Sequence, residues 1–373
     1  MRITIVGPSY PLRGGIAHHV YWLERALTGR GHQVQVVSFS RLYPSLIFPG
    51  TSEIDRSNLK LDPGGLPILS PLNPVTWARA ARAIKRFDPH VVIIQWWQPF
   101  FAPVVGALAR TVRRAGYRVI IECHNVFPHE PTPAARRLLA YAFAPVDHFI
   151  THSTTDRRDL EAIVSEREIV VSGLPALDEF YRKTDATRGG RTALFFGKVR
   201  KYKGLGTLLG AFPKVLSQVE CRLLVAGEFY DSIEKYRKQV SDLGLESHVH
   251  IENRYVPNEE VPDWFEKADV LVLPYLSATQ SGVARIAISN CLPIIAAQTG
   301  GLSEIVRDRV NGLLFAPGDA DALADALVDY FKNGLGPVLA DNLRTMNAGA
   351  PECRIVEIVE TIGQAAHPRG RSE

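Results

Sequence analysis

The sequence lacks the features of a disulfide-stabilised or membrane-spanning protein. It has four cysteines, far apart and without Cys-x-x-Cys spacing, which predicts buried free thiols and a reducing cytoplasm. No run of about 18 apolar residues occurs, so no transmembrane helix is expected. The start, Arg2–Val6, has the pattern of a strand and not that of a signal peptide. We therefore expect a cytoplasmic protein.

Signatures of three other classes are also missing. The turn after Val6 lacks the Gly-x-Gly-x-x-Gly fingerprint, which disfavours a nicotinamide dehydrogenase. No pattern of a nucleic-acid-binding module is found, so nucleic acid is not an expected partner. Histidine spacing predicts no metal site, since the adjacent His18 and His19 point in different directions on a helix.

The composition is that of a globular protein, with 46% hydrophobic and 22% charged residues, and 373 residues exceed one typical core. Basic residues are in excess only in the first half, on predicted helices: Arg79, Arg82, Lys85, Arg86, Arg110, Arg113, Arg114, Arg136 and Arg137. One interpretation is a solvated helix face. The other is a surface for peripheral contact with anionic lipid headgroups.

Short apolar strands alternate with helix-like segments along the chain. The predicted strands are Arg2–Val6, Gln33–Val37, Val91–Gln95, Arg118–Glu122, His148–Thr151, Thr192–Phe196, Cys221–Ala226, His248–Glu252 and Val270–Leu273. The helices between them include Ile16–Leu27, Trp77–Phe87, Pro103–Ala115, Ala134–Phe143, Asp156–Val164, Leu205–Leu216, Ile233–Leu243 and Val261–Lys267. This alternation predicts an α/β fold with two doubly wound, Rossmann-like domains facing a cleft.

The predicted domains are residues 1–178 and 190–350. The polar segment Ala176–Arg191 separates them, and residues 351–373 form a C-terminal helix and tail that we expect to return to the first domain. The Pro/Gly-rich segment Ser40–Pro74 is too long for a plain connection, so it predicts an irregular functional loop.

One stretch organises the second half, from Pro274 to Glu304. It has the pattern strand, polar loop, helix, strand, Gly-Gly turn, helix. Ser281-Gly282 opens an apolar helix, and a helix start with unpaired N–H groups and a positive dipole end favours anions. The alternatives are a diphosphate site and an ordinary capped helix. Glu304 is interpreted as mainly structural.

Three other segments carry candidate chemistry. Gly14-Gly15 precedes a helix and permits close approach of a ligand, although a plain turn is equally consistent. His124 and Asn125 follow a strand, where loops face the cleft, and His129 and Glu130 lie in the same loop. A cationic run also follows a strand, and it would compensate a diphosphate without a metal: Lys198, Arg200, Lys201 and Lys203.

These motifs, in this order, resemble glycosyltransferase family 4, whose members have the GT-B fold. The resemblance covers about residues 1–330. It rests on the following segments: Gly14-Gly15, His124-Asn125, Phe196–Gly204, Ala268–Pro274, Gly300–Val306 and Asn311–Asp319. It departs from the family at Ala278 and Ile286, where members usually carry two glutamates that contact the donor sugar and the ribose. The loop here reads Ser277-Ala-Thr-Gln-Ser-Gly282, a variant associated with presumed polysaccharide glycosyltransferases.

The resemblance implies a retaining, metal-independent glycosyltransferase without a cofactor, acting in polysaccharide biosynthesis. A nucleotide sugar would be the donor, bound by residues 190–350. A glycan, a lipid-linked glycan at the inner membrane face, or a small molecule would be the acceptor, bound by residues 1–178. The residues predicted to act in catalysis are His124, Lys198, Arg200 and Lys203. Those predicted to bind the donor are Gly14, Gly15, Lys203, Gly227, Val256, Thr279, Gln280, Ser281 and Gly282. Those predicted to bind the acceptor are Tyr10, Gly15, His124 and Asn125.

Two alternatives stay open. A sugar-nucleotide epimerase of the same fold would need acid and base carboxylates, for which Glu130 and Glu228 are the candidates. A non-catalytic relative that binds a nucleotide sugar or scaffolds a complex would account for the missing glutamates.

Overall fold

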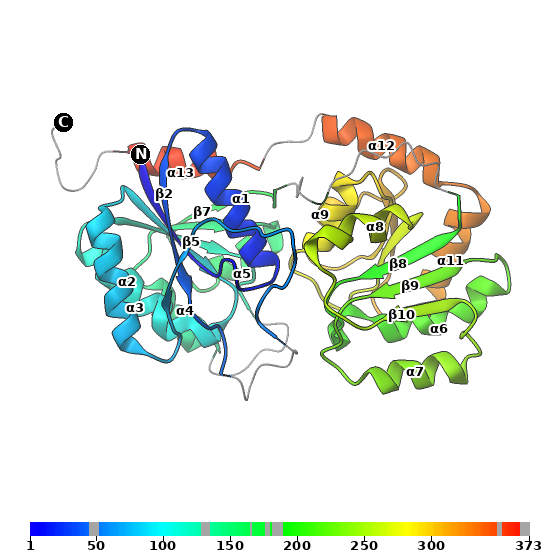
Figure 1. Cartoon of the computed structure of the whole chain (residues 1–373). Helices are drawn as coiled ribbons and strands as arrows, with labels where there is room; N and C mark the ends of the chain where they lie inside the picture. The colour runs from blue at the N-terminus through cyan, green and yellow to red at the C-terminus, as the bar shows by residue number, and fades with distance from the viewer. Residues whose placement is uncertain are drawn as a thin grey trace. The chain divides into compact units, whose positions relative to one another are not determined.

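The computed structural model describes residues 1–44, 52–127, 135–164, 166–175, 180, 189–348 and 353–365 (Figure 1). The chain divides into two compact units. The first contains Met1–Arg56, Lys60–Pro175 and Glu352–Glu373, and the second contains Ser57–Leu59 and Ala176–Pro351. The predicted loop residues His129 and Glu130 and most of the predicted linker lie outside the described residues.

The first unit is built on a seven-stranded sheet in the order β3-β2-β1-β4-β5-β6-β7. Its strands are β1 (Arg2–Val6), β2 (Gln33–Phe39), β3 (Leu66–Leu69), β4 (Val91–Trp96), β5 (Arg118–Cys123), β6 (His148–Thr151) and β7 (Glu168–Val171). Every pairing is parallel. The order reverses between β1 and β4, and the carboxyl edge at such a switch point is where doubly wound folds bind ligands.

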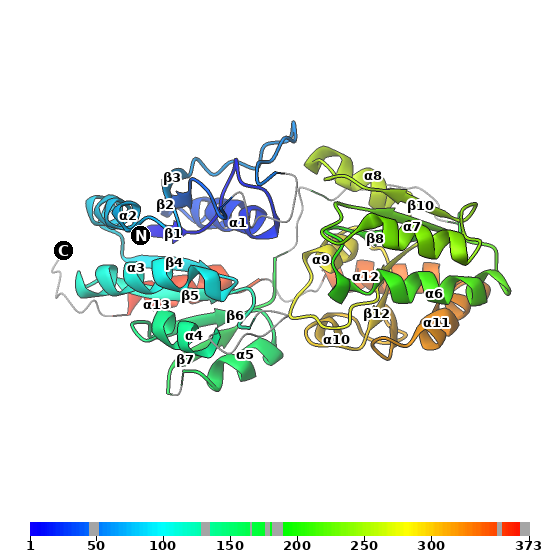
Figure 2. The same ribbon diagram turned by 90° about the horizontal axis from the view of Figure 1, so that it is seen from below.

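Helices cover both faces of this sheet (Figures 1 and 2). They are α1 (Gly15–Gly29), α2 (Pro74–Phe87), α3 (Ala102–Arg114), α4 (Ala135–Phe143), α5 (Thr154–Glu161) and α13 (Ile355–Gln364), with a 3-10 turn, η1 (Pro99–Phe101). One core packs α2, α3 and α4 against the sheet. The other core packs α1 and the C-terminal α13 against the opposite face.

The second unit repeats the design with six parallel strands in the order β10-β9-β8-β11-β12-β13. They are β8 (Thr192–Phe196), β9 (Arg222–Ala226), β10 (Val249–Glu252), β11 (Val270–Leu273), β12 (Ile294–Ala297) and β13 (Gly312–Phe315). The switch point lies between β8 and β11. The loops that leave these two strands are the cationic run and the stretch that begins at Pro274.

The helices of the second unit also form two layers. They are α6 (Leu205–Leu216), α7 (Ile233–Asp242), α8 (Val261–Glu266), α9 (Gly282–Ser289), α10 (Leu302–Ile305), α11 (Ala320–Lys332) and α12 (Gly336–Ala348), with the turns η3 (Lys201–Lys203) and η4 (Asn258–Glu260). One core holds α6, α7 and α11. On the other face α9 contacts β11 and α12, and Phe265 of α8 meets Phe196 of β8.

The predicted architecture of two Rossmann-like domains is confirmed, and the segment Ser40–Pro74 needs correction. It is not irregular throughout, because Leu66–Leu69 forms edge strand β3 beside β2. Helix α2 also begins earlier than its apolar pattern indicates, at Pro74. The Asn73 side chain accepts a hydrogen bond from the Val75 N–H, and a proline at the first helical position costs no intrahelical bond.

The cysteines fit the sequence prediction in part. All four are free thiols, but only Cys123 and Cys221 are buried, whereas Cys291 and Cys353 are half-buried. Within the part of the chain that the structure describes, no helix is long and apolar enough to cross a membrane.

Candidate active site

Two loops at the switch point of the second unit are joined to each other. Tyr202, in the loop after β8, accepts a hydrogen bond through its carbonyl from the Leu276 N–H, which follows β11 (2.7 Å). The surroundings of Gly197 show which side chains lie near both loops. A Cβ placed there would lie 3.3 Å from Cγ2 of Val283 in α9 and 3.5 Å from the Lys203 Nζ. The Lys203 ammonium and the first turn of α9 therefore border the same space.

Lys203 is a buried cation, only 9% exposed. Its ammonium lies 5.2 Å from the centre of the Tyr275 ring, a distance at which a cation is attracted to the aromatic face. Burial lowers the pKa of Lys203; Tyr202 opposes this effect and Arg200 adds to it. Burial raises the pKa of Tyr275 to about 12, so this neighbour stays neutral. A buried charge without a carboxylate partner among these neighbours suits an anionic ligand.

Helix α9 presents its N-terminus at the same place. Ser281 has extended backbone geometry, and its side chain accepts a hydrogen bond from the Ala284 N–H (3.2 Å). The N–H groups of the first turn have no partners within a helix, and the dipole makes this end positive. Gly282 is exposed, and a Cβ added to it would meet nothing within 4 Å. The sequence prediction of a Ser281-capped helix is confirmed.

Two other predicted cations lie on a single aromatic ring. Lys198 Nζ is 5.4 Å and the Arg200 guanidinium carbon 4.8 Å from the centre of the Tyr230 ring. Two backbone hydrogen bonds hold Val199, which lies between these cations, beside Tyr230. The Val199 N–H donates to the Glu228 carbonyl, and the Tyr230 N–H donates to the Val199 carbonyl (both 2.9 Å). Arg200 is exposed and Lys198 half-buried. The structure thus places these two charges on Tyr230 and the Lys203 charge on Tyr275.

The positions of the two missing glutamates are filled by core packing. Ala278 is 8% and Ile286 7% exposed. The adjacent Gly300-Gly301 turn packs directly on this loop, because a Cβ on Gly300 would lie 1.6 Å from the Ala278 carbonyl oxygen. Thr279 is held in the same way, with its carbonyl oxygen 2.0 Å from a Cβ built on Gly301. The loop is therefore shaped by backbone contacts and not by carboxylates.

A pair of glycine substitutions tests this arrangement. Gly300→Ala adds a Cβ to a left-handed residue (φ 48°) against a carbonyl oxygen, and we expect it to lower the free energy of unfolding by about 2–4 kcal/mol. Gly282→Ala meets open space, and we expect a change within about 0.5 kcal/mol. Urea denaturation of both variants measures these two changes in the free energy of unfolding. Equal stability of the two would contradict the contact between the turn and the loop.

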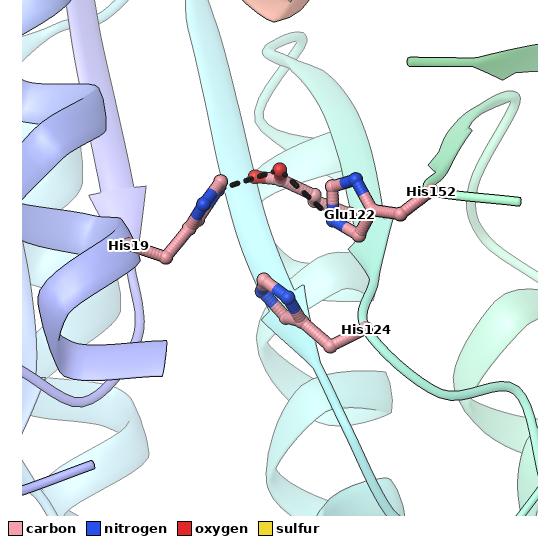
Figure 3. Close-up of side chains that lie close together, drawn as sticks. All are labelled: His19, Glu122, His124 and His152. Carbon is pink, nitrogen blue, oxygen red and sulfur yellow. Dashed lines mark hydrogen bonds and ion pairs between the residues drawn. The ribbon is translucent and has the colours of Figure 1, made fainter. Parts of the chain in front are cut away.

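The first unit brings four polar side chains together at its own switch point (Figure 3). His19 comes from α1, Glu122 from β5, and His124 and His152 from the residues that follow β5 and β6. His19 Nε2 lies 2.7 Å and His152 Nε2 3.4 Å from Glu122 Oε1. His19, Glu122 and His152 are buried, with at most 4% exposure. We call these four residues the histidine cluster.

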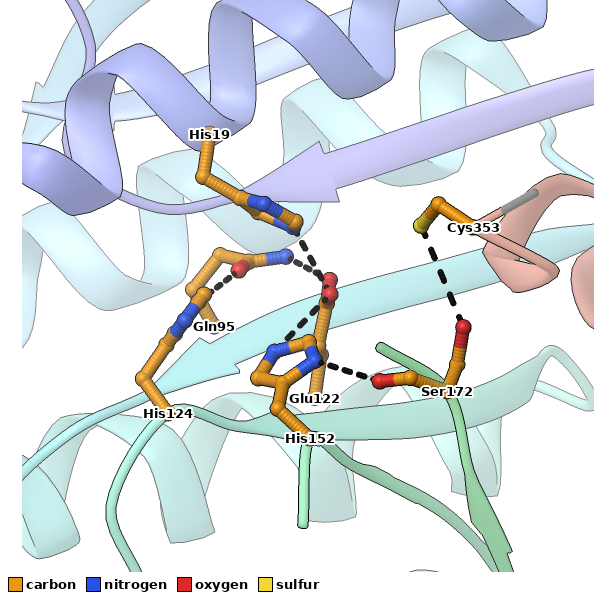
Figure 4. Close-up of polar contacts among 7 residues, drawn as sticks. All are labelled: His19, Gln95, Glu122, His124, His152, Ser172 and Cys353. Carbon is orange, nitrogen blue, oxygen red and sulfur yellow. Dashed lines mark hydrogen bonds and ion pairs between the residues drawn. The ribbon is translucent and has the colours of Figure 1, made fainter. Parts of the chain in front are cut away.

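A second set of hydrogen bonds fixes the tautomers of the histidine cluster (Figure 4). A carboxylate only accepts, so Gln95 donates from Nε2 to Glu122 Oε2 (2.7 Å) and offers its Oε1 to His124 Nε2 (2.5 Å). His124 therefore carries its proton on Nε2. His152 Nδ1 donates to the Ser172 carbonyl (3.0 Å), which places a proton on that nitrogen.

The ionisation of the histidine cluster follows from burial and from its own charges. Burial raises the pKa of Glu122, but His19, through charge and hydrogen bond, and then His152 and His124 outweigh it and hold that pKa well below its usual range. The pKa of His124 is lowered, first by burial and then by His19 and His152, against the opposing effect of Glu122. Glu122 is thus an anion and His124 a neutral imidazole.

Most of the remaining predicted residues fall at loop positions as expected. Gly227 lies against the loop after β8, because a Cβ on it would be 1.9 Å from the Gly197 carbonyl oxygen. Gly14 caps α1 with φ 128°, and Gly15 is its first residue. These two glycines belong to the first unit, as do Tyr10 and Asn125, both half-buried. Val256 is buried beyond β10, which is two strands from β8.

Several residues of these sites were not predicted from the sequence: His19, Gln95, Glu122, His152, Tyr230 and Tyr275. A signal existed for Glu122, since a carboxylate inside an apolar strand needs a buried partner. His152 follows its strand as His124 does, which is a second signal. His19 and His18 do point differently, as predicted, but the buried one meets residues far away in sequence.

Comparison with known proteins finds one family model that matches each half of the chain. The model of Glycosyltransferase Family 4 matches residues 13–172, and that of Glycosyl transferases group 1 matches residues 190–333. An uncharacterised glycosyltransferase of Methanocaldococcus jannaschii is 24% identical, with 87% of each chain covered. The phosphatidyl-myo-inositol mannosyltransferase of Mycolicibacterium smegmatis is 23% identical, covering 98% of this chain and 95% of that protein.

Solved structures share the fold over nearly the whole chain. HepE of Anabaena, in complex with UDP, superimposes with a TM-score of 0.74 at 16% identity, covering 97% of this chain and 99% of that one. Sucrose-phosphate synthase of Thermosynechococcus elongatus gives a TM-score of 0.72 at 17% identity, covering 97% and 96%. At these identities the likeness concerns the fold.

Proposed function

The chain belongs to the GT-B glycosyltransferases of family 4, and from this membership we propose that it transfers a sugar from a nucleotide-diphosphate sugar with retention of anomeric configuration. One observation carries the proposal: the buried Lys203 ammonium and the first turn of α9 border one space. A donor diphosphate would accept hydrogen bonds from the Gly282 backbone and from Lys203. The UDP complex of HepE supports UDP as the first nucleotide to test.

The proposed chemistry is stabilisation of a leaving group. As the bond between the anomeric carbon and the diphosphate breaks, negative charge grows on the phosphate oxygens. Fixed cations and N–H groups that meet this charge lower the barrier, and such electrostatic terms are usually the largest in catalysis. Lys203, Lys198 and Arg200 supply the cations in this proposal, so no metal ion is required at the diphosphate.

The acceptor would be bound by the first unit. His124 lies at the carboxyl edge of β5, and its ring is oriented by Gln95, which is itself held by Glu122. With Nε2 donating to Gln95, neutral His124 keeps an acceptor at Nδ1 for a substrate hydroxyl. In this proposal His124 orients the acceptor, and Tyr10 and Asn125 extend the same surface.

A lipid-linked acceptor is the form that we propose. A group of exposed basic residues lies on α2, α3 and α4, which pack on one face of the sheet of the first unit: Arg79, Arg82, Lys85, Arg86, Arg113, Arg114, Arg136 and Arg137. Leu72 and Val75, at the start of α2, are 66% and 60% exposed. Basic side chains beside exposed apolar ones favour contact with an anionic bilayer.

The test is a panel of nucleotide sugars read first by thermal shift and then by release of nucleoside diphosphate with lipid-linked and free glycan acceptors. We expect at least one donor to stabilise the protein and to turn over, with the α-anomer conserved from donor to product by NMR. Binding to anionic liposomes should weaken as salt is added. Failure of every donor to bind would refute the transferase proposal, and failure to bind liposomes at low salt would refute the membrane contact alone.

The pH dependence of donor binding should report Lys203. Its ammonium binds a diphosphate only while protonated, and its pKa is lowered by burial, so affinity is present at neutral pH and falls as pH rises through that pKa. The groups that face it are Tyr275, Tyr202 and Arg200. An arginine keeps its charge at alkaline pH, so the affinity of Lys203→Arg for the donor should stay constant over the pH range where that of the wild type falls. Parallel curves for the two proteins would contradict this role.

A further inference from the structure

We propose that the histidine cluster binds a divalent transition-metal ion, and that Zn²⁺ is the ion it suits. The four side chains offer one ligand atom each, and these atoms all lie within 4.8 Å of one another. In a tetrahedral zinc site with bonds of about 2.0–2.2 Å, the ligand atoms are roughly 3.4 Å apart. Small rotations of side chains already converging on one point would close the site.

The orientation of the rings matches that of metal ligands. A histidine that ligates a metal usually donates its other ring N–H to a carbonyl or carboxylate. His152 does so through Nδ1 to the Ser172 carbonyl, which leaves Nε2 facing Glu122 Oε1 at 3.4 Å. His124 does so through Nε2 to Gln95 Oε1, which leaves Nδ1 for the ion in the metal-loaded protein and for the acceptor hydroxyl in the metal-free protein. Two of the three rings are therefore already held by outer partners.

The contact between His152 and Glu122 brings two possible ligand atoms together. His152 Nε2 and Glu122 Oε1 lie 3.4 Å apart, which is the separation of two ligand atoms in a tetrahedral zinc site. Both side chains are buried, where a bound cation would be shielded from water. His19 adds a buried Nδ1 that has no hydrogen-bond partner. Imidazole nitrogens with one carboxylate form a donor set typical of zinc.

The bound ion would join three parts of the first unit. Helix α1, strand β5 and the residue after β6 each contribute at least one ligand, and Gln95 of β4 steadies Glu122. The ion would thereby stabilise the carboxyl edge of this sheet. The inference goes beyond the proposed function, because the diphosphate is assigned to Lys203 and α9 in the second unit.

The test uses the full-length chain without an affinity tag, stripped with a chelator and titrated with Zn²⁺ against a metallochromic indicator. We expect one tightly bound equivalent and a higher midpoint of thermal unfolding. His19→Ala and His152→Ala should weaken binding by more than the roughly 10- to 100-fold lost with an outer partner. The matched control is His148→Ala, a half-buried histidine paired with Glu168 outside the cluster, which should bind as the wild type does.

Two results would overturn the inference. One is a wild type that takes up no Zn²⁺, and the other is uptake that persists unchanged in the two ligand variants. If those variants do not fold, X-ray absorption spectroscopy of the zinc-loaded wild type tests the site instead. Zinc bound by the histidine cluster must show scattering from imidazole rings, and a spectrum without that scattering would refute the proposed site. These measurements use no sugar nucleotide, so a negative zinc result does not affect the transferase proposal. In the same way, a protein that binds no donor could still bind the metal ion.

Discussion

Replacing Lys203 with alanine is expected to weaken the binding of a nucleoside diphosphate by about 1.5–3 kcal/mol, which is roughly 10- to 150-fold. The side chain is buried at the edge of the space that α9 faces, and its ammonium has an aromatic neighbour, Tyr275, and no anionic one among its described contacts. A diphosphate would therefore be its principal hydrogen-bond acceptor. The loss should be seen in the dissociation constant by titration calorimetry.

The matched control is Lys201→Ala, two positions away. Lys201 is exposed, so solvent screens its charge, and we expect its removal to change affinity by less than about 1 kcal/mol. Both variants should unfold cooperatively, which thermal denaturation would check. A Lys203→Ala protein that binds the nucleotide as tightly as Lys201→Ala does would contradict the diphosphate assignment.

The second large effect is expected in the first unit, from Glu122→Ala. The substitution leaves His19, His152 and Gln95 without the buried carboxylate that three of their nitrogens face. Removing one partner of a buried charged network typically costs about 3–5 kcal/mol. We expect a loss of that size in the free energy of unfolding, measured by urea denaturation with chelator present so that no metal contributes.

Glu122→Gln is the control for this prediction. It keeps the volume of the side chain and one oxygen that accepts from His19, so we expect it to retain more than half of the stability lost by the alanine variant. A Glu122→Ala protein within about 1 kcal/mol of the wild type would show that the histidine cluster adds little to the fold.

The fold could be predicted from the sequence because its signals are local. Alternation of short apolar strands with amphipathic helices implies parallel sheets, and Ser281-Gly282 marks a helix start by itself. The two loops that carry Lys203 and Ser281 could also be located from the sequence, since each follows a strand at its carboxyl end. The sequence signal for strand β3 is weaker. Leu66–Leu69 is four residues long, contains Pro67, and has a strand partner on one side only.

The histidine cluster could not be predicted in the same way, because it is assembled from distant parts of the chain. His19 and Glu122 are 103 positions apart, and their contact depends on β1, β4 and β5 lying side by side. Spacing along the sequence, which identifies metal sites on one helix or loop, carries no information on such a set. The local signs were the charge of Glu122 in an apolar strand and the position of His152 directly after its strand.

The loop Ser277–Gly282 and helix α9 differ from the usual pattern of the family at two positions. Ala278 and Ile286 are buried, and their side chains carry no polar group, so in the proposed function they offer no hydrogen bond to the donor sugar or the ribose. Binding energy should accordingly be concentrated on the diphosphate, at Lys203 and the start of α9.

Comparing a nucleoside monophosphate, its diphosphate and the corresponding diphosphate sugar by titration calorimetry tests this claim most directly. We expect the diphosphate to bind at least about tenfold more tightly than the monophosphate, and the sugar to add little further affinity. Lys203→Ala should remove the difference in affinity between the monophosphate and the diphosphate. Equal affinity for the monophosphate and the diphosphate in the wild type would contradict it.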